Sequence, residues 1–339
     1  MKNNKCTMSN LFNAGQKKSW ESNDNKFTFI DLFAGIGGFR IGLEMNGGKC
    51  VFSSEWDKNS QLTYSTNFGS FPEGDITKID EKKVPSHNIL CAGFPCQAFS
   101  ISGKKKGFED TRGTLFFDVA RIAKQTKPDV LFLENVKNFA NHDSGKTLNI
   151  ILGTLEDLGY KTFHQILRSS DYGVPQARER IYIVAFHKRT KVKEFSFPEK
   201  NEKTVVVKDI LEKNPTLAKV INRDDIFFTE GKDDTLRLRK PNKLGIINKG
   251  RQGERIYSVN SAGITLSAYG GGIASKTGAY LVGKTIRKLS PRECARMQGF
   301  PDDFEIPVSV NLAQKQFGDS VSVPVIRSIG EKIIEALKL

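Results

Sequence analysis

The sequence of 339 residues has only four histidines and five cysteines, and no two cysteines form a C-x-x-C pair. An odd number of irregularly spaced cysteines suits neither a disulfide framework nor a zinc ribbon, so we expect a reducing compartment and no structural metal. No apolar run approaches the roughly 20 residues that a membrane helix needs. The polar start, residues 1–26, lacks the apolar centre of a secretory signal. These absences predict a cytoplasmic protein with a loosely ordered leader over residues 1–26.

Negative charge is the scarcer sign in this sequence. The 38 Asp and Glu residues stand against 52 Lys and Arg residues, which gives a net charge of +14. Such a balance favours a polyanionic partner, and nucleic acid is the commonest one in cytosol. On charge alone, a merely soluble basic protein is the alternative. The length suits one large domain or two unequal domains.

Short apolar runs alternate with amphipathic stretches over residues 27–195. FTFIDLF, NILCAGF and DVLFLEN are typical of buried strands, whereas TLFFDVARIAKQ and TLNIILGTLEDLGY are typical of helices. The alternation predicts an α/β fold with a doubly wound, mostly parallel sheet and helices on both faces. Ligands of such sheets bind beyond the carboxyl ends of the strands, so the residues after each run are candidates for the site.

The alternation ends near residue 195. Residues 196–286 are charged and then rich in Gly and Arg, with short alternating segments, which predicts a smaller domain of loops and strands. Residues 287–339 are expected to return to the large domain through a helix that starts with the capping box of Ser290, Pro291 and Glu293. The last helix should dock there through one apolar stripe: Ile326, Ile329, Ile333 and Leu337.

The segment DLFAGIGGFR places Gly35, Gly37 and Gly38 in a turn between the first predicted strand and a helix. Glycines there let the backbone approach a nucleotide, and Glu55, at the end of the next strand, suits ribose hydroxyls. Arg40 stands where G-x-G-x-x-G has its third glycine, which favours a mononucleoside cofactor such as S-adenosylmethionine over a dinucleotide. A glycine turn that serves only close packing is the alternative.

Cys96 follows a predicted strand in the loop GFPCQAFS, where its thiol can face a cleft. Cys91, inside the apolar run, is expected to be an inert core thiol. Glu134 in FLENV ends another strand at the same edge of the sheet. A thiolate at Cys96 could add to a ring carbon of a base while the Glu134 carboxyl protonates a ring nitrogen. Taken alone, Glu134 could equally be a helix-capping acid.

Three further groups are candidates for contacts to a ligand. Arg178 and Arg180 in QARER enter a strand on one face, where they could bind a base, a phosphate or the Glu134 carboxylate, or form a solvated edge. Asp75 in GDIT could accept from an adenine amino group or be an exposed turn residue. The lysines at 104–106 suit a loop that closes on a phosphate backbone, or a solvated loop.

The order of these motifs resembles that of the DNA cytosine-5 methyltransferases. The resemblance covers the chain from about residue 27 to its end, through DLFAGIGGFR, EWD, GDIT, GFPCQAFS, ENV, QARER, RKLSPRECARMQGFP and FGDSV. Its Pro-Cys-Gln, Glu-Asn-Val and Gln-x-Arg-x-Arg segments are highly specific. GERIY and ITLSAYGGGI are similar to the target-recognition segments of a member that modifies the inner cytosine of GCGC. The resemblance implies methyl transfer from S-adenosylmethionine to C5 of cytosine in double-stranded DNA.

The resemblance also implies roles for individual residues. The target cytosine is turned out of the duplex, Cys96 adds to C6, Glu134 binds N3 and the amine, Arg180 steadies O2, and Arg178 supports Glu134. Arg255 is implied as a bidentate ligand of guanine. The implied cofactor pocket consists of Phe33, Gly35, Ile36, Gly37, Gly38, Glu55, Trp56, Asp75, Ile76, Pro95, Leu115, Asp319 and Ser320. The implied DNA contacts are Ser100, Ser102, Gln252, Arg255, Ser267, Tyr269 and Gly272.

Asp319 departs from the asparagine usual in this family, which adds a negative charge and removes an amide donor. We expect it to be tolerated, with some change in cofactor affinity or in pocket pKa values. Two other functions stay open: the same chemistry on RNA, whose major groove is unreadable, and a non-catalytic DNA-binding homologue, which the joint presence of the four catalytic residues disfavours. We further expect a monomer of a type II restriction-modification system, with any cognate endonuclease acting separately.

Overall fold

The computed structural model describes residues 17–95, 115–229 and 238–339, so Cys96, Ser100, Ser102 and the lysines at 104–106 lie outside the described residues. Six strands form the main sheet in the order β2-β1-β3-β4-β6-β5. The pairs from β2 to β4 are parallel, and β6 runs antiparallel to both β4 and β5. The predicted mostly parallel sheet is therefore confirmed. The strands are β1 (Phe27–Leu32), β2 (Gly48–Ser54), β3 (Ile89–Gly93), β4 (Val130–Val136), β5 (Tyr160–Arg168) and β6 (Glu179–His187).

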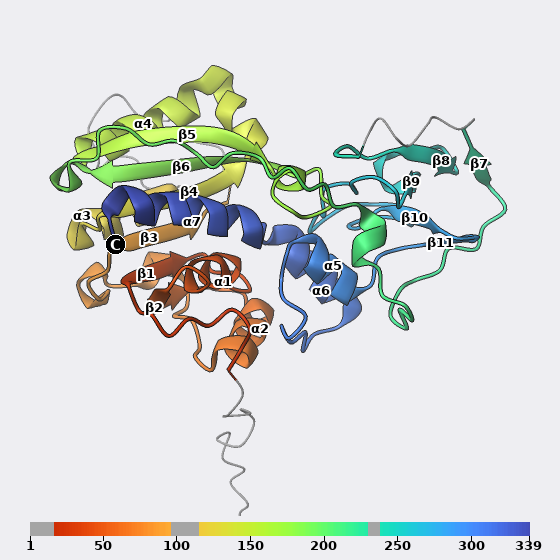
Figure 1. Cartoon of the computed structure of the whole chain (residues 1–339), viewed down its shortest axis with the longest axis horizontal. Coiled ribbons are helices and arrows are strands. Elements are labelled where there is room, and N and C mark those ends of the chain that lie inside the picture. The colour runs from red at the N-terminus through yellow and green to blue at the C-terminus, as the bar shows by residue number, and fades with distance from the viewer. Residues whose placement is uncertain (1–16, 96–114, 230–237) are drawn as a thin grey trace, which may run out of the picture.

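Helices cover both faces of this sheet (Figure 1). On one face lie α1 (Gly38–Glu44) and α7 (Val323–Leu337), and on the other lie α3 (Leu115–Thr126) and α4 (Lys146–Asp157). A further helix, α2 (Lys58–Phe68), follows β2. None of the helices in the described parts of the chain is long and apolar enough to cross a membrane. The doubly wound arrangement leaves the carboxyl ends of β1, β3 and β4 together at one edge, where a ligand site is expected.

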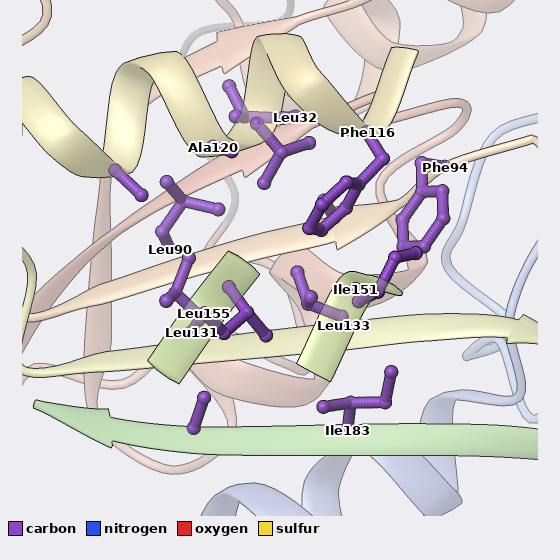
Figure 2. Close-up of a cluster of buried hydrophobic side chains, with 14 of the residues drawn as sticks. Leu32, Leu90, Phe94, Phe116, Ala120, Leu131, Leu133, Ile151, Leu155 and Ile183 are labelled. Carbon is purple, nitrogen blue, oxygen red and sulfur yellow. The ribbon is translucent and has the colours of Figure 1, made fainter. Parts of the chain in front are cut away.

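Alternate residues of each strand enter the cores on opposite faces, because side chains have a period of two along a strand. In β3, Leu90 packs in the cluster with α3 and α4, whereas its neighbour Cys91 packs in the cluster with α7. Figure 2 shows Leu90 and the other labelled side chains of the strands beside Phe116 of α3 and Ile151 of α4. Burial raises the pKa of the Cys91 thiol well above its usual range. Cys91 is thus a core thiol without thiolate character, as expected.

A second sheet lies beside the first, with the strand order β11-β10-β9-β8-β7. Its strands are β7 (Ile226–Phe228), β8 (Lys243–Ile247), β9 (Arg255–Ser258), β10 (Ala279–Val282) and β11 (Thr285–Arg287). Between the two sheets lie α5 (Pro291–Met297) and α6 (Val310–Asp319) (Figure 1). The strands fall within or at the end of the range predicted for the smaller domain. The domain limits at residues 195, 196, 286 and 287 stay a prediction.

The return segment begins and ends as the sequence predicts. Ser290 caps α5 by accepting a hydrogen bond from the Glu293 backbone N–H, while the Glu293 side chain accepts one from the Ser290 N–H. The carboxylate of Glu293 also forms a buried, two-pronged ion pair with Arg287, at 2.7 and 2.8 Å, which ties β11 to α5. In α7, the predicted stripe packs on the sheet and on α1: Ile326, Ile329, Ile333 and, partly buried, Leu337.

The described part of the polar leader, residues 17–26, is anchored rather than loosely ordered. Trp20 is 1% exposed, and its ring centroid lies 5.9 Å from that of Phe68 and 6.1 Å from that of Phe304. Ser19 donates from its backbone N–H and its hydroxyl to the Asp303 carboxylate, both at 2.8 Å. A single tryptophan in a polar stretch gave too weak a signal to predict this packing, because its partners lie far away in the sequence.

Candidate active site

The glycine turn after β1 contains one glycine that faces open space and two that are needed for packing. A methyl group placed on Gly35 would meet no atom within 4 Å, whereas one on Gly37 would lie 2.3 Å from the Phe68 ring. One on Gly38 would lie 2.7 Å from Val321. Gly35 also has φ +56°, and Phe33 takes φ +57°, which is uncommon for a residue with a side chain. The free surface above Gly35 is the part of the turn that suits a bound cofactor.

Glu55 holds this turn from the end of β2. Its carboxylate oxygens accept from the backbone N–H groups of Gly35 and Asp57, both at 2.8 Å. Burial raises the pKa of Glu55. Each oxygen keeps a second lone pair, so the carboxylate can also accept from a ligand hydroxyl. The neighbouring Trp56 is 77% exposed, so its ring is available as an apolar surface beside the turn.

The other expected cofactor residues flank the same edge. Asp75 caps a short 3₁₀ turn that contains Ile76, and its carboxylate accepts from the N–H and hydroxyl of Thr77. These hydrogen bonds lower the pKa of Asp75. Pro95 and Leu115 are the described residues on either side of residues 96–114. Asp75 is therefore a turn residue, and its remaining lone pairs can still accept from an adenine amine.

Beneath the turn, Asp31 of β1 is fully buried, and neither of its carboxylate oxygens has a well-aligned hydrogen bond among the described residues. Burial raises its pKa to about 8. In the unfolded chain this pKa is about 3.9, so between about pH 4 and pH 8 the folded state binds one more proton than the unfolded state. Asp31 should therefore make the protein less stable as the pH rises through that range.

We expect Asp31→Asn to remove this pH dependence. The contribution of Asp31 to the slope of unfolding free energy is at most about 1.4 kcal/mol per pH unit. Urea unfolding of the two proteins at several values between pH 5 and pH 8 measures the slopes. Parallel slopes in the wild type and the variant would show that Asp31 is ionised in the folded protein.

Glu134 and Arg180 form a largely buried ion pair at the end of β3. Glu134 is 8% exposed, and the distance from its Oε1 to Arg180 Nε is 3.0 Å. Gly93, the last residue of β3, lies directly opposite Glu134 in the sheet. Neither Glu134 Oε1 nor Arg180 Nε has a well-aligned hydrogen bond within the described residues. The carboxylate thus keeps acceptor capacity for a ligand at the edge where the loop of Pro95 begins.

The loop itself is tied to this acid through its neighbour. The Asn135 side chain donates to the carbonyl oxygen of Phe94 at 3.0 Å, and both groups are buried. Asn135 thereby fixes the backbone one residue before Pro95. Cys96 follows Pro95 directly in the sequence, but its position lies outside the described residues.

Arg178 is a buried junction between three segments. It is 2% exposed, and its guanidinium donates to the carbonyl oxygens of Leu266 at 3.2 Å, Gly318 at 3.0 Å and Ser320 at 2.7 Å. Burial, with the nearby charge of Arg180, lowers the pKa of Arg178 to about 9, so it remains charged at neutral pH. Charged donors to backbone carbonyls are among the stronger protein hydrogen bonds. Arg178 therefore binds the end of α6 to the segment that contains Ser267.

The implied support of Glu134 by Arg178 takes a different form. The ion pair to Glu134 comes from Arg180, and the hydrogen bonds of Arg178 go to carbonyl groups. Arg178 influences Glu134 through its charge, since the two are neighbours in the electrostatic environment. Of the two arginines of QARER, Arg180 therefore binds the acid and Arg178 binds the surrounding backbone.

Two buried glutamines complete this junction, and the sequence predicted no role for either side chain. Gln298 donates to the carbonyls of Phe317 and Ser320, and Gln176 donates to Gln298 while accepting from the Leu266 N–H. Both glutamines are fully buried. The sequence does carry one sign of their burial: each glutamine stands among apolar residues, Gly or Pro, in MQGF and VPQA, where a solvent-exposed glutamine is unexpected.

Asp319 is paired with Lys315, one helical turn earlier in α6, at 3.2 Å. The Lys315 ammonium also lies 5.5 Å from the ring centroid of Tyr269, which is 75% exposed. The next residue, Ser320, packs on the glycine turn, because a methyl group on Gly38 would lie 2.9 Å from its hydroxyl oxygen. The end of α6 thus touches both the glycine turn and the exposed Tyr269.

The remaining expected DNA contacts gather in two touching loops beside β9. Gln252 lies in a short exposed turn, and Arg255 follows it as the exposed first residue of β9. The backbones of Gly253 and Gly272 are in close contact. A methyl group placed on Gly272 would lie 2.6 Å from the carbonyl oxygen of Gly253. Ser267 packs its backbone against Gly318 at the end of α6. Gln252, Arg255, Ser267, Tyr269 and Gly272 therefore belong to connected segments, and Ser100 and Ser102 lie outside the described residues.

Comparisons with known proteins agree on one family. The model of the C-5 cytosine-specific DNA methylase family matches residues 27–335. The chain is 53% identical to the type II methyltransferase M.HhaI of Haemophilus parahaemolyticus over 310 residues, which cover 91% of this chain and 94% of that protein. It is 48% identical to the type II methyltransferase M.HpaII of Haemophilus parainfluenzae over 338 residues, which cover 94% of this chain and 92% of that protein.

Solved structures share the fold at much lower identity. The Entamoeba histolytica methyltransferase EhMeth aligns with a TM-score of 0.68 and 21% identity, over 92% of this chain and 99% of that chain. The S. pombe Dnmt2 methyltransferase aligns with a TM-score of 0.67 and 19% identity, over 93% of this chain and 100% of that chain. At this identity the two matches support the architecture and nothing finer.

Proposed function

Because this chain belongs to the C-5 cytosine-specific DNA methylases, we propose that it methylates the inner cytosine of GCGC sites in double-stranded DNA. It is a DNA (cytosine-5-)-methyltransferase, and its family uses S-adenosylmethionine as the methyl donor. The family does not determine the recognition sequence. GCGC is favoured by the likeness of GERIY and ITLSAYGGGI to a GCGC reader and by the overall identity of 53% to M.HhaI.

One observation carries the proposed chemistry: the buried Glu134–Arg180 pair at the edge where the loop of Cys96 begins. We assign Cys96 as the nucleophile that adds to C6 of the flipped cytosine. Glu134 holds N3 and the exocyclic amine, and Arg180 steadies both Glu134 and O2. Addition would place electron density on C5, which would take the methyl group from the sulfonium of the donor and leave that donor as a neutral sulfide. Loss of the C5 proton then expels the thiolate and restores the ring.

The residues around the glycine turn fit S-adenosylmethionine, which supplies the electrophilic methyl group when bound. The surface above Gly35 is open, and Glu55 keeps lone pairs for ribose hydroxyls. Phe33 and Trp56 would flank the adenine, and Asp75 would accept from its amine. The other proposed pocket residues are Ile36, Gly37, Gly38, Ile76, Pro95, Leu115, Asp319 and Ser320, of which Gly37 and Gly38 contribute through packing of the turn.

The proposed function is tested by bisulfite sequencing of plasmid DNA from cells that express the chain. We expect protection of the inner cytosine at every GCGC site and of no other cytosine class. Protection at another sequence would overturn the proposed site while leaving the chemistry intact. Protection of no cytosine, in cells where the folded protein accumulates, would contradict the function itself.

We expect Arg255→Ala to weaken the choice of sequence. A bidentate contact between arginine and guanine discriminates by about 1–3 kcal/mol, roughly 5- to 150-fold. Methylation rates on duplexes with the guanine replaced by adenine give the ratio before and after the substitution. Arg251→Ala, which changes a neighbouring exposed arginine, is the matched control. If Arg255→Ala keeps the wild-type ratio, another residue reads the guanine.

We expect the tolerance of Asp319 to depend on Lys315. With the ion pair at 3.2 Å, Lys315→Met leaves the Asp319 carboxylate without its partner next to Ser320, which should change the affinity for S-adenosylmethionine by up to about fivefold, the range of a partly exposed ion pair. In an Asp319→Asn background the same substitution should have little effect. Calorimetric affinities of the four proteins complete the cycle. Additive changes would show that Lys315 and Asp319 act separately.

We also propose the setting in which this enzyme works. The named relatives are type II methyltransferases, which favours a restriction-modification system with a separate cognate endonuclease. A cytoplasmic location is part of this proposal. A monomer on its DNA is proposed, because two unequal sheets would embrace one duplex.

A further inference from the structure

A lysine-rich hollow lies at the end of the main sheet opposite to the candidate active site. Its volume is about 500 Å³, and it is lined by Tyr160, Val192, Glu156 and four lysines at positions 161, 188, 191 and 193. Tyr160 begins β5 and pairs with His187, the last residue of β6. Arg180 stands seven residues earlier in β6, which at about 3.3 Å per residue separates the two places by roughly 23 Å.

The hollow is also remote from the second sheet. The arrowhead of β6 points away from the strands β7–β11 (Figure 1). A duplex held by Arg255 and the active-site edge therefore lies at the other end of the molecule. Whatever binds in the hollow is not the part of the substrate that surrounds the target base.

The charge of the hollow is unbalanced. Among the seven lining residues, four are lysines and one is an acid. Lys188, Lys191 and Lys193 form no ion pair with any residue in the described ranges, whereas the nearby Arg189 is bound to Asp129 at 2.8 Å. Because the charge of Arg189 is neutralised and the charges of the three lysines are not, the electrostatic potential at the hollow is positive.

Lys188 and Lys191 extend from a turn that hydrogen bonds hold in place. Residues Lys188–Thr190 form a 3₁₀ turn that follows β6, and the Thr190 hydroxyl donates to the His187 carbonyl at 2.9 Å. Lys191 closes the turn with φ +60°, a conformation that glycine adopts freely and other residues seldom adopt. The turn thereby fixes the backbone from which Lys188 and Lys191 extend.

We propose that this hollow binds the phosphodiester backbone of a second stretch of DNA. Lysines act as point charges on phosphates without reading the bases, which suits binding independent of sequence. DNA is stiff over about 150 base pairs, so one short duplex cannot bend to reach both ends of the sheet. The hollow therefore holds a separate duplex or a distant segment of a long one. The proposal rests on DNA as the substrate and on neither Cys96 nor the GCGC assignment.

The test is the number of short duplexes that the full chain binds. A duplex of about 12 base pairs without a target sequence is titrated at about 50 mM salt and followed by native mass spectrometry and sedimentation. The variant carries Lys188→Ala, Lys191→Ala and Lys193→Ala. Its control carries Lys49→Ala, Lys82→Ala and Lys83→Ala, three exposed lysines elsewhere, so that both proteins have the same net charge.

We expect the wild type and the control to bind a second duplex, and the hollow variant to bind it about tenfold more weakly. The salt dependence of the second step should fall by about 0.9 for each phosphate that the variant no longer neutralises. Methylation of a short target duplex should stay unchanged in both variants. Equal weakening in the two triple variants would reduce the effect to net charge and overturn the proposal. A wild type that binds one duplex only would overturn it as well.

Discussion

Glu134→Gln is expected to lower the turnover number about 10²- to 10⁴-fold, the usual contribution of a positioned acid or base. The amide removes the proton that Glu134 would share with N3 of the base, and it breaks the 3.0 Å ion pair with Arg180. An unpaired Arg180 in a buried site should turn to neighbouring carbonyls. Because Glu134 lies outside the glycine turn, affinity for S-adenosylmethionine should change little.

Single-turnover methylation and calorimetric cofactor binding separate these two effects. Glu179→Gln is the matched control, since Glu179 directly precedes Arg180 in β6 and forms partly exposed ion pairs with Lys137 and Arg168 at 2.9 and 2.8 Å. We expect near wild-type turnover in that control. Full activity in Glu134→Gln would mean that the buried pair is structural and that the acid is elsewhere.

Cys96→Ser is expected to abolish methylation, which is the largest effect predicted for any substitution in this chain. A serine hydroxyl is far less acidic than a thiol and is not activated by any base in the proposed site, so addition to C6 fails. The substitution keeps a small polar side chain at this position. Binding of target DNA and of cofactor should therefore persist.

Filter binding of target duplex and a methyl-transfer assay on the same sample measure both quantities. Cys6→Ser, in the polar leader, serves as the control for removal of one thiol. If Cys96→Ser keeps even a few per cent of wild-type turnover, another nucleophile operates.

The local signals of the sequence were sufficient for the main elements. Val, Ile, Phe and Leu runs predicted the buried strands, and the Ser290–Glu293 capping box predicted the start of α5. The alternation of runs and helices also predicted the mostly parallel sheet. These features depend on interactions between near neighbours and on burial, both of which are visible in the order of residues.

The interactions between distant segments were not predictable in the same way. The anchoring of Trp20 by Phe304 joins residues 284 positions apart, and the junction of Arg178 with Leu266 joins residues 88 positions apart. Buried polar residues such as Gln176 and Gln298 become meaningful only when their partners are known. The different partners of Arg178 and Arg180 likewise depend on which carbonyl groups lie near each guanidinium. The periodicity of the sequence does not predict those neighbours.

The three glycines of the turn after β1 show what the sequence could and could not predict. The motif DLFAGIGG predicted a turn that a nucleoside could approach, and the space above Gly35 agrees with that use. Gly37 and Gly38 are instead required because Phe68, Ser320 and Val321 pack where their side chains would be. Close packing and ligand approach select the same residue, so the sequence alone left both explanations open.

Covalent trapping on a duplex that carries 5-fluorocytosine in the inner position of GCGC tests the central claim most directly. Fluorine cannot leave as the C5 proton does, so methyl transfer from S-adenosylmethionine should strand the enzyme as an adduct joined through Cys96. Mass spectrometry of the digested complex should find the modified base on the peptide that contains residue 96, with no adduct in Cys96→Ser. The account would be contradicted if the enzyme methylates the same duplex with unmodified cytosine but forms no adduct with the fluorinated one. An adduct at a residue other than Cys96 would contradict it as well.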